Sequence, residues 1–308
     1  MIYKEEKIKL KVGIDLGGSH IAIGVVNKGR IIEKVEKRIL TNEKKEIKAV
    51  IEKYIFENVK EISKKYKVYQ IGIAIPGTVT DNKIIKSVNL GIEDYDIVKE
   101  LNKKIKLPIK IRNDAKCAAL AENKYGCLKN HKRTIFLTLG TGIGGAVIIN
   151  NKLLDTGKLP GCEFGHMVIE KNGLLCKCGK FGCWEKYASM KAFKDNLRKN
   201  LGYDESTNSQ ELLNILRNVK ENQENYEIIE NIVEQYIEDL GVGISNLVNI
   251  FEPEIIGIGG SFVYFKDILL PRLSMKLLEK DILFNSRKQI DIETAILEND
   301  AGIIGATI

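Results

Sequence analysis

The chain has 308 residues, 44% hydrophobic and 29% charged, which is enough for a sizeable core in one large or two moderate domains. Its net charge of +7 comes from lysines interleaved with glutamates, which indicates a solvated surface and argues against a nucleic-acid patch. The first residues form no apolar signal core, no apolar run reaches membrane-spanning length, and the six cysteines do not form the framework of a small secreted chain. We therefore expect a soluble cytoplasmic protein that binds neither nucleic acid nor a membrane.

The first strong pattern is a strand that turns at glycine. Apolar residues alternate through residues 9–32 and are interrupted by Gly17 and Gly18, which predicts strand, glycine turn, strand and hairpin. The same order of features returns over residues 134–154 around the turn 140–145. This self-similarity predicts two halves of related architecture.

The other expected elements alternate between helices and strands, which is the pattern of α/β layers. In chain order they are a helix over 41–66, strands over 70–75 and 109–112, helices over 114–126, 191–203 and 228–251, strands over 254–258 and 290–296, and an apolar helix from Ala301. The segment 204–225 is polar, and we expect it to be an insertion.

Three glycine-rich turns follow expected strands, at residues 15–19, 140–145 and 257–261. Glycine lets consecutive backbone N–H groups point inward, which forms an anion-binding site suited to phosphates. Each turn alone is better explained as a bulge or tight hairpin. Their recurrence, with Ser19 and Thr141 beside them, predicts a nucleotide held between two domains. The spacings match neither the Walker pattern nor the dinucleotide fingerprint.

Asn113 and Asp114 lie where a strand is expected to pass into a helix that stops at Gly126. Asn113 is a suitable N-cap, and the helix dipole would keep Asp114 ionised. An ionised carboxylate there can accept the proton of a sugar hydroxyl as that hydroxyl attacks a phosphoryl group. Taken alone, the dipeptide is better explained as an ordinary helix start.

The segment 160–189 carries one imidazole and three thiols in a loop that also contains glycines. These four residues are His166, Cys176, Cys178 and Cys183. They form a tetrahedral zinc set, and four protein ligands leave no open position for an activated water, so we predict a structural zinc. Glu163 and Glu185 bracket the ligands and can accept hydrogen bonds from the hydroxyls of a polyol.

Several stretches together resemble the ROK family of repressors, open reading frames and kinases. The most specific is E-F-G-H at residues 163–166, followed by C-K-C-G-K-F-G-C-W-E at residues 176–185. The others are I-D-L-G-G-S-H, N-D-A-K-C-A-A-L-A-E, L-G-T-G-I-G-G, I-G-I-G-G-S and A-G-I-I-G-A. The resemblance implies a two-domain α/β, actin-like ATPase fold of the hexokinase and ribonuclease-H type with an interdomain cleft. It implies an N-terminal lobe of residues 1–112, joined by a helix over 299–308, and a C-terminal lobe of residues 113–298 with the zinc loop.

The resemblance also implies roles for individual residues, with Asp114 as the catalytic base that deprotonates the sugar 6-hydroxyl. The sugar would contact Gly77, Asn89, Asn113, Asp114, Glu163, His166 and Glu185. ATP and Mg²⁺ would contact Asp15, Gly17, Gly18, Ser19, His20, Gly140, Thr141, Gly142, Gly144, Gly145, Gly259 and Gly260. His166 would bind zinc through one ring nitrogen and the sugar through the other.

The function implied by the resemblance is an ATP-dependent kinase of the hexose 6-hydroxyl, with glucose as the expected sugar and a homodimer or higher homo-oligomer as the expected assembly. N-acetylmannosamine or another amino sugar stays open, because the sequence does not show the space around the sugar 2-position. A sugar-responsive transcriptional regulator needs a DNA-binding helix-turn-helix ahead of the first strand. Only about ten residues precede Val12, so we rank this function below the kinase. His20 stands where a lysine is common in the family, which leaves the phosphate contacts of the first turn open.

Overall fold

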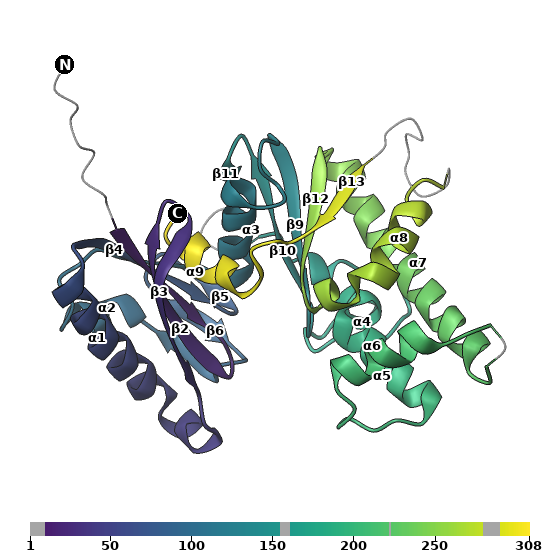
Figure 1. Cartoon of the computed structure of the whole chain (residues 1–308), viewed down its shortest axis with the longest axis horizontal. Helices are drawn as coiled ribbons and strands as arrows, with labels where there is room; N and C mark the ends of the chain where they lie inside the picture. Colours follow the sequence, from purple (N-terminus) through teal and green to yellow (C-terminus); the bar gives the residue numbers. More distant parts are fainter. Residues whose placement is uncertain (1–9, 155–160, 222, 280–289) are drawn as a thin grey trace. The chain divides into compact units, whose positions relative to one another are not determined.

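The computed structural model describes residues 10–154, 161–221, 223–279 and 290–308. Residues 1–9, 155–160, 222 and 280–289, some of which belong to segments discussed above, lie outside this description. The chain forms two compact units (Figure 1). The first comprises Met1–Lys129, Leu153–Gly161 and Leu297–Ile308, and the second comprises Asn130–Lys152 and Cys162–Ile296. None of the helices in the described ranges is long and apolar enough to span a membrane.

The first unit is built on a five-stranded sheet with the strand order β3-β2-β1-β4-β8. Its strands are β1 (Leu10–Leu16), β2 (His20–Asn27), β3 (Arg30–Arg38), β4 (Val68–Ile75) and β8 (Ile109–Asn113). Neighbours among β1, β2 and β3 are antiparallel, whereas β4 is parallel to β1 and β8 is parallel to β4. The carboxyl ends of β1, β4 and β8 therefore meet at one edge of the sheet.

Helices cover both faces of this sheet. On one face, helix α1 (Ile47–Lys65) buries residues at helical spacing, including Ile51 and Ile55, against Val12 and Ile14 of β1. On the other face, helix α9 (Ala301–Ala306) lies so close to β1 that a Cβ atom on Gly13 would overlap the carbonyl oxygen of Ile303. Successive residues of a strand point to opposite faces, so Val12 and Ile14 face α1 while Gly13 faces α9.

A small sheet and a short helix lie between β4 and β8 in the chain, where the sequence predicted no element. The strands are β5 (Thr78–Val79), β6 (Ile84–Ser87) and β7 (Ile92–Tyr95), followed by helix α2 (Ile97–Asn102). Strands of two and four residues are too short to show a period in the sequence, which explains why they were missed.

The second unit repeats the topology of the first. Its sheet has the order β11-β10-β9-β12-β13. The strands are β9 (Arg133–Leu139), β10 (Ile143–Ile149), β11 (Lys152–Leu153), β12 (Ile255–Gly260) and β13 (Asp291–Thr294). As in the first sheet, the first strand forms an antiparallel hairpin with the second, and two later strands add in parallel on its other side. The predicted relationship between the two halves is confirmed.

The helices of the second unit gather around the long helix α7 (Tyr226–Phe251) (Figure 1). The others are α4 (Glu185–Ala188), α5 (Met190–Leu201), α6 (Ser209–Asn218) and α8 (Lys266–Lys276), with short 3₁₀ turns η2 (Phe164–His166) and η3 (Ser261–Phe265). The segment predicted as a polar insertion contains α6, whose start is capped by the side chain of Asn208. Leu212, Leu213 and Leu216 of α6 are buried, so this part of the segment packs against the unit.

Helix α3 (Asp114–Tyr125) belongs to the first unit, whereas the sequence placed the boundary between lobes after residue 112. The reason is close packing with α9, because a Cβ atom on Gly305 would overlap the carbonyl oxygen of Cys117. The carboxylate of Glu122 adds two hydrogen bonds, from the backbone nitrogen of Cys127 at 2.9 Å and from that of Leu297 at 2.8 Å.

Candidate functional site

In the first unit, the predicted site residues gather where β1, β4 and β8 end. Asp15 of β1 is paired in register with Ala74 of β4, and Ala74 with Arg112 of β8. The residues that follow these three positions therefore leave the sheet at one edge, which is where the first glycine turn, Gly77 and the start of α3 lie.

Asn113 joins two of these strand ends. Its side-chain oxygen accepts a hydrogen bond from the backbone nitrogen of Lys116 at 3.1 Å, which confirms the predicted N-cap of α3. Its side-chain nitrogen donates to the carbonyl oxygen of Gly77 at 3.0 Å. Gly77 has φ +106°, and a Cβ atom there would overlap the carbonyl oxygen of Lys86, so this position requires glycine.

Asp15 and Asp114 are half-buried carboxyl groups, and the charge of Asp114 acts on Asp15. Burial, with a smaller contribution from the charge of Asp114, raises the pKa of Asp15 to about 7. Burial also raises the pKa of Asp114, although the backbone nitrogen of Ala115 donates to its carboxylate at 2.8 Å. Burial thus opposes the stabilisation of the ionised form that we expected from the helix dipole. A raised pKa makes the ionised carboxylate a stronger base, which favours proton abstraction.

The first glycine turn is closed by a hydrogen bond from the backbone nitrogen of Gly17 to the carbonyl oxygen of His20 at 2.8 Å. The imidazole of His20 lies over Gly17, where a Cβ atom would overlap the ring. A Cβ atom on Gly18 would lie 3.3 Å from the Cβ of Asn89. The structure therefore brings Asn89 to the turn, and Ser19 is exposed on it.

In the second unit, two glycine turns lie at the ends of neighbouring parallel strands. After β9, the backbone nitrogen of Gly140 donates to the carbonyl oxygen of Gly142 at 3.0 Å, and Thr141 between them is exposed. At the end of β12, Gly260 has φ +76°, and a Cβ atom there would lie 2.5 Å from the carbonyl oxygen of Leu139. Gly259 precedes it on the same strand. These turns can present backbone N–H groups to one anionic ligand.

Gly144 and Gly145 were predicted to contact ATP, and the structure places both within strand β10. Gly145 is buried, and a Cβ atom there would overlap the carbonyl oxygen of Phe136 in the neighbouring strand. The close approach of the two strands thus accounts for glycine at position 145.

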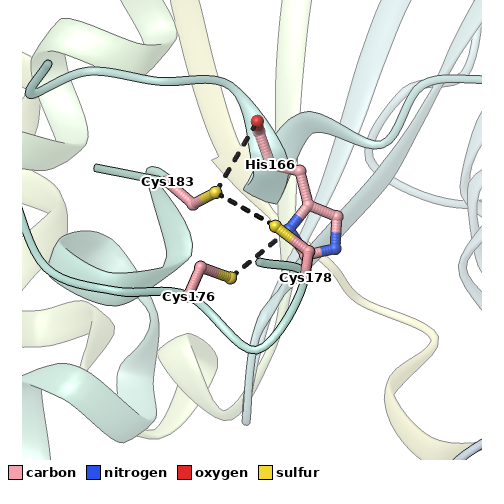
Figure 2. Close-up of side chains that lie close together, drawn as sticks. All are labelled: His166, Cys176, Cys178 and Cys183. Atoms are coloured by element: carbon pink, nitrogen blue, oxygen red, sulfur yellow. Dashed lines mark hydrogen bonds between the residues drawn. The ribbon is translucent and has the colours of Figure 1, made fainter. Parts of the chain in front are cut away.

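The four predicted zinc ligands come together in the second unit (Figure 2). Their donor atoms all lie within 4.8 Å of one another. The Nδ1 atom of His166 is 3.7 Å from the Sγ atom of Cys176, and the Sγ atoms of Cys178 and Cys183 are 3.5 Å apart. A tetrahedral zinc with Zn–S bonds of about 2.3 Å and a Zn–N bond of about 2.0 Å has ligand separations of about 3.5–3.8 Å. The donor set and its spacing therefore fit zinc.

A compact turn shapes this cluster. The backbone nitrogen of Cys176 donates to the carbonyl oxygen of Lys180 at 2.8 Å, and Gly179 has φ +89°. Burial raises the pKa of the Cys176 and Cys183 thiols, whereas the backbone N–H of Lys180 lowers the pKa of Cys178. A bound cation would offset the cost of holding buried thiols as thiolates.

Trp184 anchors the loop and was not predicted. Its side chain is fully buried, and its indole nitrogen donates to the carbonyl oxygen of Asp239 in α7 at 2.9 Å. A Cβ atom on Gly243 of α7 would overlap the indole ring, so this glycine makes room for it. The sequence could have indicated this anchor, because the single tryptophan of the chain directly follows the predicted ligand Cys183.

The two acids that bracket the ligands differ in their surroundings. Glu163 is exposed and is the N-cap residue that precedes η2, where its carbonyl oxygen accepts from the backbone nitrogen of His166 at 3.0 Å. Glu185 is half-buried beside the cluster, with its Oε1 atom 3.7 Å from Nδ1 of His166 and 3.3 Å from Sγ of Cys176. Nδ1 of His166 faces the thiols, which leaves Nε2 on the opposite side of the ring (Figure 2).

Two related sheets with glycine turns at their strand ends, and a C-terminal helix packed on the first sheet, define an α/β protein of the actin-like class. Comparison with known families shows which family within this class the chain belongs to. The chain belongs to the ROK family, whose profile matches residues 11–308.

Individual relatives agree with this assignment. The chain is 31% identical to a glucokinase of Thermotoga maritima over 316 residues, which cover 97% of this chain and 96% of that protein. It is 31% identical to a xylose repressor of Bacillus subtilis over 270 residues, which cover 85% of this chain and 67% of the repressor. A solved ROK family glucokinase from Streptomyces griseus, in complex with glucose and AMPPNP, matches with a TM-score of 0.76 at 26% identity over 96% of this chain and 97% of that one. The predicted family and actin-like α/β fold are confirmed.

Proposed function

We propose that the protein is an ATP-dependent kinase that phosphorylates the 6-hydroxyl of a hexose, with glucose as the preferred sugar. The observation that carries the proposal is the half-buried Asp114 carboxyl at the start of α3, beside the Asn113 side chain that is bonded to Gly77. The similarity to glucokinases supports it, since the relative from Thermotoga maritima matches over almost its whole length.

In the proposed reaction, Asp114 accepts the proton of the sugar 6-hydroxyl as the hydroxyl oxygen forms a bond to the γ-phosphorus of ATP. The bond from that phosphorus to the β,γ-bridging oxygen breaks, and ADP leaves. Asn113 and Gly77 form one hydrogen-bonded unit, so a sugar that contacts one is positioned against both. Asn89 lies beside the first glycine turn and would contact the same sugar.

In the second unit, Glu163, His166 and Glu185 are the proposed contacts to the remaining sugar hydroxyls. They are carried by η2 and by the start of α4, on either side of the Cys/His cluster. The proposed zinc, when bound, holds this loop in shape. The imidazole would then have one nitrogen on the metal side and the other available to a hydroxyl.

The glycine turns are the proposed contacts of the nucleotide. Backbone N–H groups at three places would contact the phosphates and the adenosine. They lie in the turn at Gly17 and Gly18, in the turn from Gly140 to Gly142, and at the strand end of Gly259 and Gly260. The N–H groups of Gly17 and Gly140 are not among them, because they close their own turns. The Asp15 carboxylate is a hard oxygen ligand that fits Mg²⁺, which would supply charge neutralisation at the phosphates.

An ADP-release assay across glucose, mannose, N-acetylglucosamine, N-acetylmannosamine, allose and fructose tests the proposal. The highest kcat/KM with glucose supports it, and the highest value with N-acetylmannosamine replaces it by the amino-sugar alternative. The absence of turnover with every sugar contradicts a kinase. The assembly, for which we expect a homodimer or higher homo-oligomer, is tested by light scattering.

A sugar-responsive regulator is the second candidate function, because the chain also matches the xylose repressor of Bacillus subtilis. It predicts sugar binding without ADP release, together with sugar-dependent binding to DNA. Calorimetry with xylose and a DNA-retardation assay separate it from the kinase.

A further inference from the structure

The side chain of Glu185 lies between the Cys/His cluster and the glycine turn after β9. On the cluster side, its Oε1 atom is 3.3 Å from Sγ of Cys176 and 3.7 Å from Nδ1 of His166. On the turn side, a Cβ atom added to Gly142 would lie 2.5 Å from Oε2 of Glu185. One carboxylate thus contacts two predicted metal ligands with one oxygen and approaches the turn with the other.

Two glycines leave the room that this carboxylate occupies. The first is Gly142, and the second is Gly165 of η2. A Cβ atom on Gly165 would lie 3.2 Å from both Cβ and Oε2 of Glu185. The same atom would lie 2.5 Å from the carbonyl oxygen of Ile143, the first residue of β10 after the turn. The turn, η2 and Glu185 therefore form one packed group within the second unit.

The backbone makes a second connection between the same parts. Ligand Cys183 is followed by the buried Trp184 and then by Glu185, and a few residues later the backbone nitrogen of Lys191 donates to the carbonyl oxygen of Gly140 at 3.0 Å. Ser189 fixes this stretch by capping α5, since its hydroxyl accepts from the backbone nitrogen of Ala192 at 3.1 Å. The cluster and the turn are thus also connected through a short, hydrogen-bonded stretch of backbone.

We propose that Glu185 is a positioning residue that couples the metal cluster to the glycine turn 140–142, so that metal binding and nucleotide-phosphate binding strengthen each other. The nucleotide half of this inference rests on the proposed function. The metal half does not, because it concerns only the contacts of Glu185 within the second unit. Such a coupling is reciprocal, so the factor by which the metal raises nucleotide affinity equals the factor by which nucleotide raises metal affinity.

The first test uses Gly142→Ala in the full chain, with Gly140→Ala as the matched control. The new methyl group in Gly142→Ala must displace the flexible carboxylate of Glu185. The methyl group in Gly140→Ala has no neighbouring atom within 4 Å. Groups that contact metal ligands typically alter metal affinity about 10–100-fold when changed. We expect about tenfold weaker zinc binding in Gly142→Ala, measured by competition with a chromophoric chelator, and an altered visible spectrum of the cobalt-substituted protein. Gly140→Ala should match the native protein in both measurements. Equal zinc affinity and equal cobalt spectra for the two variants would overturn the proposal.

The second test measures the dissociation constant of ADP by calorimetry for metal-loaded and metal-stripped protein. We expect metal removal to weaken ADP binding about tenfold, which lies within the usual 5- to 150-fold range of coupling between sites. In the Glu185→Gln variant, metal removal should change the dissociation constant of ADP less than twofold. If metal removal weakens ADP binding in Glu185→Gln as much as in the native protein, Glu185 does not have the proposed role. If the loaded native protein binds no ADP, the proposed function fails, and the zinc and cobalt measurements on Gly142→Ala still decide the metal half.

Discussion

The side-chain amide of Asn113 donates a hydrogen bond to the carbonyl oxygen of Gly77 at 3.0 Å, while its oxygen caps helix α3. One side chain therefore fixes both the start of the helix that carries Asp114 and the strand end after β4. The proposed base thus sits at a well-defined place, because its helix cannot shift without breaking the contact to Gly77.

Replacement of Asp114 by Asn removes the proposed proton acceptor. We expect kcat to fall about 10²–10⁴-fold while the dissociation constant for the sugar changes little, since the amide keeps the size of the side chain. Steady-state kinetics and sugar calorimetry measure the two quantities. Asp96→Asn is the matched control, because Asp96 caps α2 in the same unit and Asn caps equally well. A kcat for Asp114→Asn within a few-fold of the native value would show that Asp114 is not the base.

The raised pKa of Asp15 predicts a specific dependence of stability on pH. The folded protein holds this proton up to about pH 7, whereas the unfolded chain releases it near the ordinary aspartate pKa of 3.8. Between these values the folded state binds more protons, so this group makes the protein less stable as the pH rises. Asp15→Asn removes the effect, and its melting temperature relative to the native protein should rise by a few degrees from pH 5 to pH 8.

Thermal unfolding in a series of buffers measures this difference. A difference in melting temperature between the variant and the native protein that stays constant from pH 5 to pH 8 would contradict the raised pKa of Asp15. Asp114→Asn serves as a comparison, since burial raises the pKa of that carboxyl in the same direction.

The cluster predicts one zinc per chain that depends on Cys178. In Cys178→Ser a neutral hydroxyl replaces a thiolate ligand, and we expect the zinc content to fall from about one equivalent to near zero after a chelator wash. Cys162→Ser is the matched control, because this cysteine adjoins the loop but lies outside the ligand set. Mass spectrometry of the metal content compares the two. Native protein that is metal-free and fully active would disprove the role of the cluster.

Gly77 and Gly91 provide a paired test of backbone strain. Both have positive φ values, +106° and +66°, but a Cβ atom overlaps the carbonyl oxygen of Lys86 only at position 77 and meets open space at position 91. We expect Gly91→Ala to lower the free energy of unfolding by about 1 kcal/mol through conformation alone. Gly77→Ala adds the overlap and should cost about 3 kcal/mol. Urea unfolding measures both, and equal losses would mean that the contact to Lys86 relaxes without cost.

The sequence by itself determined the elements with strong local signals. Alternating apolar residues and glycine pairs predicted the hairpins of both units, and the repeat of this pattern predicted two halves of related architecture. The capping role of Asn113 and the Cys/His cluster could also be predicted, because an N-cap acts within one helical turn and the four ligands are close together in the chain. The short strands of β5–β7 could not be predicted, since so few residues carry no detectable period.

Only the tertiary structure decided how distant residues act on one another. The parallel register of β1, β4 and β8 brings separate strand ends to one edge, and the charge of Asp114 there contributes to the raised pKa of Asp15. Burial also raises the pKa of Asp114 and so outweighs the helix start, which was expected to favour its ionised form. Glu185 was predicted from its place beside the ligands, but its contact with Gly142 follows from the packing of α4 and η2 against β10. Local patterns fix which residues can turn, cap or bind a metal. Burial and register depend on the whole packed unit, so they set the pKa values and the couplings between sites.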